Sequence, residues 1–170
     1  MRKLIFGWFK KNEKELETPP ASPTPDATEA TELPNAADQQ IKDLCARGDH
    51  HAAKREFNRA LSLYWEAFDL LPEPRTKWNA GTWILTVIGD ANFLAGDFVA
   101  GRDNLTTAMH YPDAIGNPFI HLRLGQCQFE LGERDRAADE LTRAYMGGGM
   151  NILLEDDPKY LEFLESRIKL

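Results

Sequence analysis

Apolar side chains recur at intervals of three and four residues along most of the chain after residue 35. This spacing is typical of amphipathic α-helices, and no segment shows the strict alternation of a half-buried strand. One such series is Phe57, Leu61, Tyr64, Phe68 and Leu71, which places its members on one helix face. The pattern predicts an all-α fold, with helices at about residues 41–48, 49–71, 75–95, 98–111, 118–132, 137–146 and 157–170.

The predicted helix ends are marked by residues that favour caps or cannot continue a helix. Pro72 ends the second helix, since proline lacks the N–H that a helix interior needs. Gly96 is placed to cap the third helix and Asp97 to begin the fourth. Pro118 suits the first position of the fifth helix, and three glycines at 147–149 break the sixth.

The first 34 residues differ from the rest in composition. Residues 12–34 are rich in Pro, Thr, Ala and Glu, so they cannot bury enough apolar surface to offset the entropy of ordering, and we expect a disordered linker. Residues 1–11, MRKLIFGWFKK, form a basic and aromatic tip that is too short to span a bilayer. A disordered or loosely docked tip is the preferred interpretation, and a weak interfacial membrane contact is the alternative. The folded domain is expected over residues 35–170.

Two stretches of the chain resemble each other at a constant offset of 36 residues. The matching pairs are Gly89 with Gly125, Phe93 with Phe129, Gly96 with Gly132, Leu105 with Leu141, and Ala108 with Ala144. Gly89 and Gly125 lie in mid-helix, where glycine costs about 1 kcal/mol relative to alanine. We therefore expect both glycines to let a neighbouring helix approach closely.

These landmarks resemble the tetratricopeptide-repeat (TPR) family, which has a small residue on the first helix of each pair, glycine at the turn and spaced alanines on the second helix. The resemblance covers about residues 36–146. Within the family, this sequence is similar to small bacterial TPR proteins. Gly101 replaces the usual alanine, the aromatic residue comes one position late, and the period of 36 exceeds the typical value of about 34. The resemblance implies an α-solenoid of about three helix pairs.

A degenerate repeat precedes the two matched ones. In the segment CARGDHHAAKREFNRAL, Gly48 is assigned to the turn and Ala60 to the second helix. A second register also fits, and one elongated helix over 49–71 accommodates both. After the repeats, residues 157–170 are expected to form the capping helix that covers the last apolar face of such a solenoid.

The resemblance also implies a binding site, because ligands of this family lie along the concave face lined by the first helix of each pair. Carried over by position, the partner-binding residues are Trp83, Asp90, Phe93, Phe119, Arg123, Gln126 and Glu130. This mixture of aromatic anchors and orienting polar groups favours a protein or peptide ligand. The alternative is that Arg123 and Glu130 belong only to a solvated face.

Composition argues against several other classes of function. The net charge of −7 argues against nucleic-acid binding and favours a basic partner. Two separated cysteines and four histidines without ligand spacing predict no metal site, no cofactor and a reducing, cytoplasmic location. No nucleophile-elbow or phosphate-loop motif occurs, so no catalytic residue is assigned and the protein is expected not to be an enzyme.

Two functions follow from these observations. The first is a non-catalytic protein–protein interaction scaffold, that is, an adaptor or chaperone-like module that holds a peptide or protein in its groove. The second is an inhibitor, such as an immunity protein that neutralises a cognate bacterial toxin. The acidic charge fits a basic toxin but does not require one.

Overall fold

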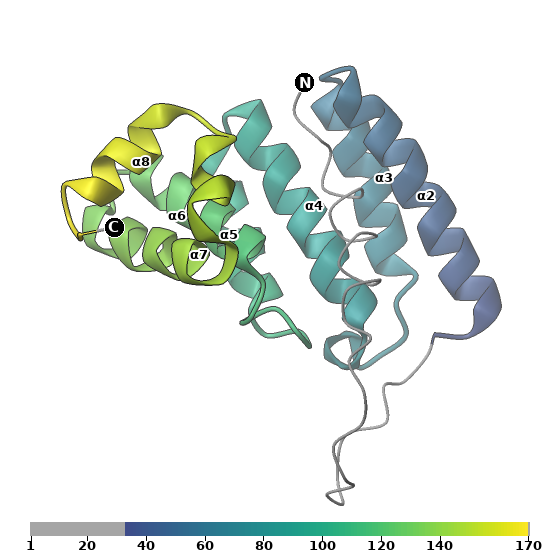
Figure 1. Ribbon diagram of the computed structural model, residues 1–170. Coiled ribbons are helices and arrows are strands. Elements are labelled where there is room, and N and C mark those ends of the chain that lie inside the picture. Colours follow the sequence, from purple (N-terminus) through teal and green to yellow (C-terminus); the bar gives the residue numbers. More distant parts are fainter. Residues whose placement is uncertain (1–32, 170) are drawn as a thin grey trace, which may run out of the picture.

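The computed structural model describes residues 33–169, which form α-helices joined by short turns (Figure 1). The helices are α2 (Asn35–Ala53), α3 (Phe57–Asp69), the 3₁₀ helix η1 (Arg75–Lys77), α4 (Asn79–Ala95), α5 (Phe98–Ala108), α6 (Pro118–Glu130), α7 (Arg134–Leu154) and α8 (Pro158–Glu165). The expectations for the tip at 1–11 and for residues 12–32 of the linker lie outside the described residues. Within the described part, no helix combines the length and the apolar character that crossing a bilayer requires.

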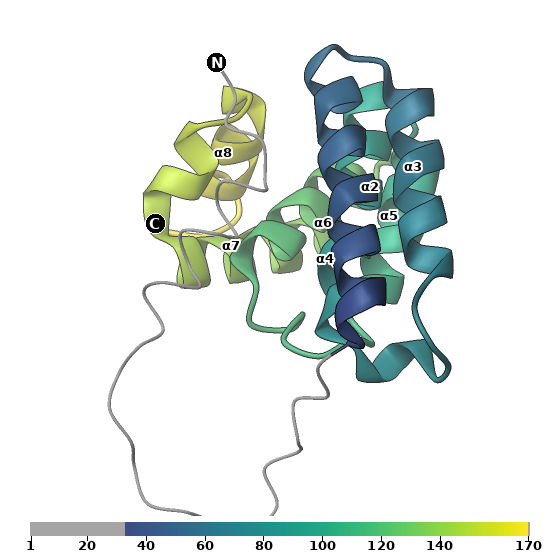
Figure 2. The same ribbon diagram turned by 90° about the vertical axis from the view of Figure 1, so that its right-hand side faces the viewer.

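Six of the helices form three consecutive pairs, α2 with α3, α4 with α5 and α6 with α7. Successive pairs pack through α3 on α4 and α5 on α6, α4 also contacts α6, and α8 packs on α7. Figure 1 shows the pairs following one another from α2 and α3 to α6 and α7, and the turned view has α2 and α3 on one side and α8 on the other (Figure 2). The prediction of an all-α solenoid of about three helix pairs with a capping helix is confirmed.

All three pairs share one close contact between their two helices. A glycine in the first helix packs against a large side chain 16 residues later in the second, which gives the pairs Gly48 with Tyr64, Gly89 with Leu105 and Gly125 with Leu141. A Cβ on these glycines would lie 2.3 Å from Cε1 of Tyr64, 2.4 Å from Cγ of Leu105 and 2.9 Å from Cγ of Leu141. The expected close approach at the two later glycines is confirmed, and the first pair has the same contact.

The register predicted for the first repeat is wrong. Gly48 lies inside α2, which continues to Ala53, so no helix spans 49–71. The chain turns at residues 54–56, and α3 begins at Phe57. Gly48 was mistaken for a helix end because glycine marks both caps and close helix contacts, and here the missing Cβ makes room for the Tyr64 ring.

The turn of the first repeat has no glycine. Gly96 and Gly132 make the corresponding turns of the later repeats with φ angles of 85° and 78°, and Arg55 makes the first turn with φ at 61°. Positive φ is the region that glycine adopts without steric penalty and that arginine seldom adopts. An arginine at this position therefore left no turn signal in the sequence.

Two further differences concern helix ends. The third predicted helix starts at Asn79 and not at residue 75, because residues 75–77 form the separate turn η1. The predicted break at 147–149 is confirmed at Gly149, whose φ of 66° and ψ of −169° are not helical, although a short helical stretch resumes up to Leu154. Asp157 then caps α8 by accepting a hydrogen bond from the Lys159 backbone N–H at 3.1 Å.

The apolar faces of these helices meet in two adjoining clusters. One gathers mainly buried side chains of α2, α3 and α4, together with Ala108 at the end of α5, and the other gathers mainly those of α5 to α8, together with Phe93 of α4. Fully buried members include Ile41, Ile84, Ile88, Leu105, Ile120, Leu141 and Leu164. Burying each such side chain contributes about 1.5–3 kcal/mol, so packing between pairs holds the solenoid together.

Candidate functional site

The seven residues predicted to bind a partner lie on the inner face, which we define as the face formed by α4 and α6. They are Trp83, Asp90 and Phe93 on α4, and Phe119, Arg123, Gln126 and Glu130 on α6. Asp90, Phe93, Arg123 and Gln126 are at most 9% exposed, and the other three are half-buried. The structure places four of the predicted residues in the interior, and it brings Asp90, Phe93, Phe119 and Gln126 into contact with Arg123.

Arg123 is the centre of a buried ion cluster on this face. Its guanidinium donates from Nε to Asp90 Oδ1 and from Nη1 to Asp156 Oδ2 at 2.6 Å. Nη1 also lies 2.6 Å from Gln126 Oε1, and the Phe93 ring centroid lies 4.8 Å from the guanidinium carbon. Burial acts to lower the pKa of Arg123, but the two carboxylates outweigh it and raise that pKa, so the arginine stays charged.

The chain's own C-terminal segment contacts the inner face. Tyr160 of α8 donates its hydroxyl to Glu130 Oε1 at 2.7 Å and lays its ring against Phe129 and Phe93, with centroids 5.3 and 6.4 Å apart. Lys159 Nζ lies 2.7 Å from the same Glu130 oxygen. Burial and this hydrogen bond raise the pKa of the Tyr160 hydroxyl. The inner face of the third repeat is therefore engaged by residues 156–160.

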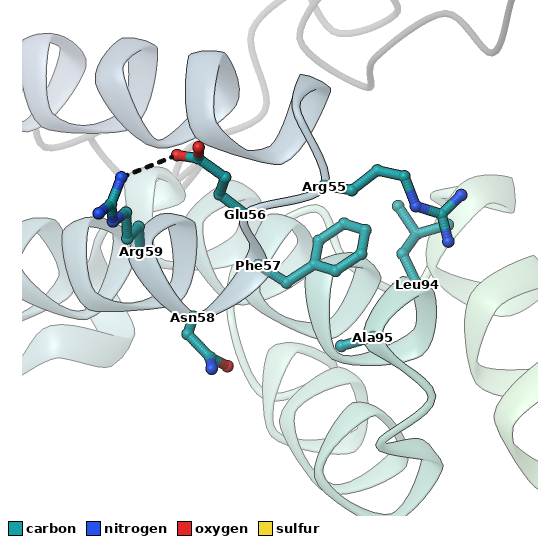
Figure 3. Close-up of a pocket in the computed structure, with 7 residues that line it drawn as sticks. All are labelled: Arg55, Glu56, Phe57, Asn58, Arg59, Leu94 and Ala95. Atoms are coloured by element: carbon teal, nitrogen blue, oxygen red, sulfur yellow. Dashed lines mark hydrogen bonds and ion pairs between the residues drawn. The ribbon is translucent and has the colours of Figure 1, made fainter.

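An open groove adjoins the inner face and runs along the turns that join the two helices of the first and second pairs. We call it the turn-end groove. It consists of two hollows of about 640 and 330 Å³, which share Arg55, Phe57, Leu94 and Ala95 as lining residues. The first hollow is further lined by Glu56, Asn58 and Arg59, and the second by Phe93, Gly96, Phe98, Glu130, Asp157, Lys159 and Tyr160. Figure 3 shows Arg55, Phe57 and Leu94 around the first hollow.

Charged groups at the groove differ in whether they have partners. Glu56 lies 2.6 Å from His51 Nδ1 and 3.3 Å from Arg59 Nη1, and the hydrogen bond to His51 is the main cause that lowers the pKa of Glu56. Lys159 is held by Glu130 and, at 3.7 Å, by Asp157. Arg55 has no ion pair or side-chain hydrogen bond with any described residue, and its guanidinium carbon lies 5.9 Å from the Phe57 ring centroid.

Both cysteines of the described part and one histidine, His121, are buried. Cys45 and Cys127 are free thiols, and burial raises the pKa of each to about 12, which keeps them protonated at neutral pH. The two ring nitrogens of His121 lie 2.5 Å from Glu140 Oε2 and 2.7 Å from the Ile115 carbonyl. No group of three His, Cys, Asp or Glu side chains with the spacing of a metal site occurs among residues 33–169.

Of the seven residues predicted to bind a partner, two, Phe93 and Glu130, line the turn-end groove. Arg55 and Phe57 are predicted for no site. The feature of the sequence that would have indicated Arg55 is the register of the first repeat. When Gly48 is aligned with Gly89, Arg55 falls at the place of the turn glycine, and an arginine there is unusual enough to draw attention.

Comparisons of the sequence with models of protein families and with curated protein sequences found no match. Solved structures do match. They include the C-terminal TPR-containing domain of a Plasmodium falciparum protein described as FK506-binding, at 16% identity and a TM-score of 0.60, covering 78% of this chain and 88% of that chain. The Arabidopsis OM64 TPR domain matches at 17% identity and a TM-score of 0.61, covering 78% of this chain and 99% of that chain. The first TPR domain of human RPAP3 matches at 16% identity and a TM-score of 0.59, covering 75% of this chain and 94% of that chain. The chain has the TPR fold.

Proposed function

We propose that this TPR solenoid is a non-catalytic scaffold that binds a segment of another protein. The observation that supports the proposal best is the turn-end groove, in which apolar side chains from α3, α4, α5 and α8 line an open hollow on the surface. Solenoids present extended surfaces of this kind for binding. Covering apolar surface gains about 25 cal/mol per Å², so such a groove favours a ligand with apolar anchors.

The chemistry of the described side chains supports binding rather than catalysis. A nucleophile needs an activated thiol, hydroxyl or amine next to a base. Cys45 and Cys127 instead have a raised pKa and are no more than 1% exposed, and the His121 ring is held between Glu140 and a backbone carbonyl. Free, buried thiols are also compatible with a reducing compartment such as the cytoplasm.

The predicted inner-face residues keep a conditional role in this proposal. A partner reaches Arg123 and Gln126 only if Asp156 and Tyr160 move away, because these two residues contact the same face. Binding at the inner face therefore requires displacement of the C-terminal segment. Binding at the turn-end groove requires no such movement, so we assign the first contact to that groove.

Affinity capture with matched variants tests the proposal. Leu94→Glu puts a charge where both hollows meet, and Asn58→Trp fills the first hollow from an exposed position. Leu154→Glu is the control, since Leu154 is 61% exposed and does not line the groove. The full-length chain and the control are expected to capture the same protein from native lysate, and both groove variants are expected to lose it. The captured protein, once purified, should bind the chain directly in calorimetry.

Two results would overturn the proposal. One is that no protein is enriched on the wild-type chain relative to the groove variants. The other is that the captured protein binds Asn58→Trp as tightly as wild type, since this exposed substitution leaves the fold intact. The inhibitor hypothesis makes a narrower statement, namely that one dominant partner is captured and that its toxicity to a host is suppressed by this chain. An adaptor or chaperone-like module predicts no such rescue.

A further inference from the structure

The end of the first helix pair carries a local excess of positive charge. We call residues 47–59 the basic tip. They hold four lysine or arginine residues against two acidic ones, a net charge of +2, in a chain whose net charge is −7. The basic side chains of this segment are Arg47, His50, His51, Lys54, Arg55 and Arg59, and all except His51 are exposed. A hollow lined by Arg47, His51 and Arg59 adjoins the turn-end groove through Arg59.

The two acidic residues of the basic tip have partners other than Arg55. Asp49 is half-buried and accepts a hydrogen bond from the Tyr64 hydroxyl at 2.7 Å, and burial is the main cause that raises the pKa of Asp49. Glu56 is engaged by His51 and Arg59. Arg55 has no ion pair with a carboxylate among the described residues, and it lines the turn-end groove together with the apolar side chains of Phe57 and Leu94.

The backbone at Arg55 is a second, independent feature that points to a binding role for this residue. The turns of the other two repeats use glycine at the same place, and a glycine at 55 would relieve the steric conflict of a φ of 61°. Arg55 makes no polar side-chain contact within the described part that would offset this strain. Strained residues of this kind cluster at binding sites, where a ligand gives the side chain its role.

We propose that the turn-end groove and the basic tip together bind an acidic segment of a partner protein. An apolar side chain of that segment packs on Phe57 and Leu94, and a neighbouring carboxylate pairs with the free Arg55 guanidinium, which suits carboxylates because of its planar, two-donor geometry. The inference rests on the proposed scaffold function and specifies the chemistry of its partner. It also reverses the expectation of a basic partner, which considered only the net charge of the whole chain.

A peptide ligand fits these features better than a nucleic acid. The basic tip is short, and the rest of the chain is acidic, whereas non-specific nucleic-acid binding needs several phosphates neutralised along a continuous basic surface. The adjoining groove is lined by Phe57, Leu94 and Ala95, which suit an apolar anchor more than a phosphate chain.

The test uses the full chain and a random-peptide library displayed on phage. Peptides selected on the wild-type chain are expected to be enriched in Asp or Glu next to Phe, Leu, Trp or Met. A selected peptide, synthesised with a fluorescent label, should bind Arg55→Gly about tenfold more weakly than wild type, because one charge-assisted contact is lost.

The Arg55→Gly variant should also unfold at a higher urea concentration than wild type, since glycine suits the turn. Lys169→Gly, which removes the same charge from an exposed position near the C-terminus, should bind like wild type.

Several outcomes would overturn this inference. They are a selection that yields no peptides, selected peptides without acidic enrichment, and a peptide whose affinity does not change in Arg55→Gly. Salt-sensitive binding of a labelled oligothymidylate that Arg55→Gly abolishes would instead assign the basic tip to nucleic acid. If capture in the groove experiments succeeds while the peptide selection fails, only the acidic chemistry of the partner is wrong. If capture fails as well, the scaffold function itself is wrong.

Discussion

Arg123 and Arg55 are the same residue type in two opposite environments. Arg123 is 6% exposed, donates to Asp90 and Asp156, and lies between the rings of Phe93 and Phe119. Arg55 is exposed at a strained turn and has no carboxylate among the described residues. Sequence reasoning assigned partner binding to Arg123 and overlooked Arg55.

The difference shows why a charge on an expected binding face is weak evidence of binding. A buried arginine must have its charge compensated within the fold, because an uncompensated ion in the interior costs several kcal/mol. Arg123 therefore ties α4, α6 and the segment before α8 together, and these partners leave little of it for a ligand. An exposed arginine needs no such compensation, so it is available to a ligand from the start.

The largest effect is expected at Arg123. Arg123→Ala removes the guanidinium from the buried carboxylate of Asp90 and from Asp156, and should lower the free energy of unfolding by about 3–5 kcal/mol. Arg123→Glu adds a third carboxylate and should leave the chain unfolded at neutral pH. Urea denaturation followed by circular dichroism measures both variants.

Arg136→Ala is the matched control for the buried ion cluster. Arg136 is 75% exposed in its side chain and pairs with Glu133 at 3.2 Å, so its loss should change the free energy of unfolding by less than about 1 kcal/mol. If Arg123→Ala lowered the free energy of unfolding as little as Arg136→Ala does, the inner face would be an open surface. Arg123 and Arg55 would then not differ in environment.

The next largest effect tests the register that places Arg55 at a turn. Gly48→Ala improves helix propensity by about 1 kcal/mol, but its Cβ would lie 2.3 Å from the ring of Tyr64, which is only 2% exposed. Overpacking of this kind should lower the free energy of unfolding by about 1–3 kcal/mol in a urea titration. Gly116→Ala, with nothing within 4 Å of its Cβ, should be close to neutral. A stabilised Gly48→Ala chain would contradict the shared contact of the three pairs.

Much of the fold was accessible from the sequence because the packing repeats. The offset of 36 residues located two helix pairs, their mid-helix glycines and their turns, and proline marked the starts of α6 and α8. The first pair was harder, because it lies 41 residues before the second when its glycines are aligned, and its turn has arginine in place of glycine. Because Arg55 stands where glycine makes the later turns, the predicted boundary between the first two helices is wrong by several positions.

The site was less accessible than the fold. Position within a repeat correctly grouped residues on α4 and α6, but it cannot show that Asp156 and Tyr160 return to the same face. Those contacts depend on the non-helical backbone at Gly149, which lets the chain change direction after the last pair. The turn-end groove likewise combines residues from five helices and from the turns between them, and no local sequence pattern indicates it.

The smallest effect tests whether arginine is truly strained at these turns. Gly96 has φ at 85° with nothing within 4 Å of the place of a Cβ, so the Cβ of Gly96→Arg meets no neighbouring atom and the expected cost is the strain of its own backbone. It should lower the free energy of unfolding by about 1 kcal/mol, and Arg55→Gly should raise it by a similar amount. Because both changes act at equivalent turns, the double variant should have nearly the stability of wild type. If Gly96→Arg had no effect, arginine would be an ordinary turn residue in this solenoid, and its presence at position 55 would need no ligand to account for it.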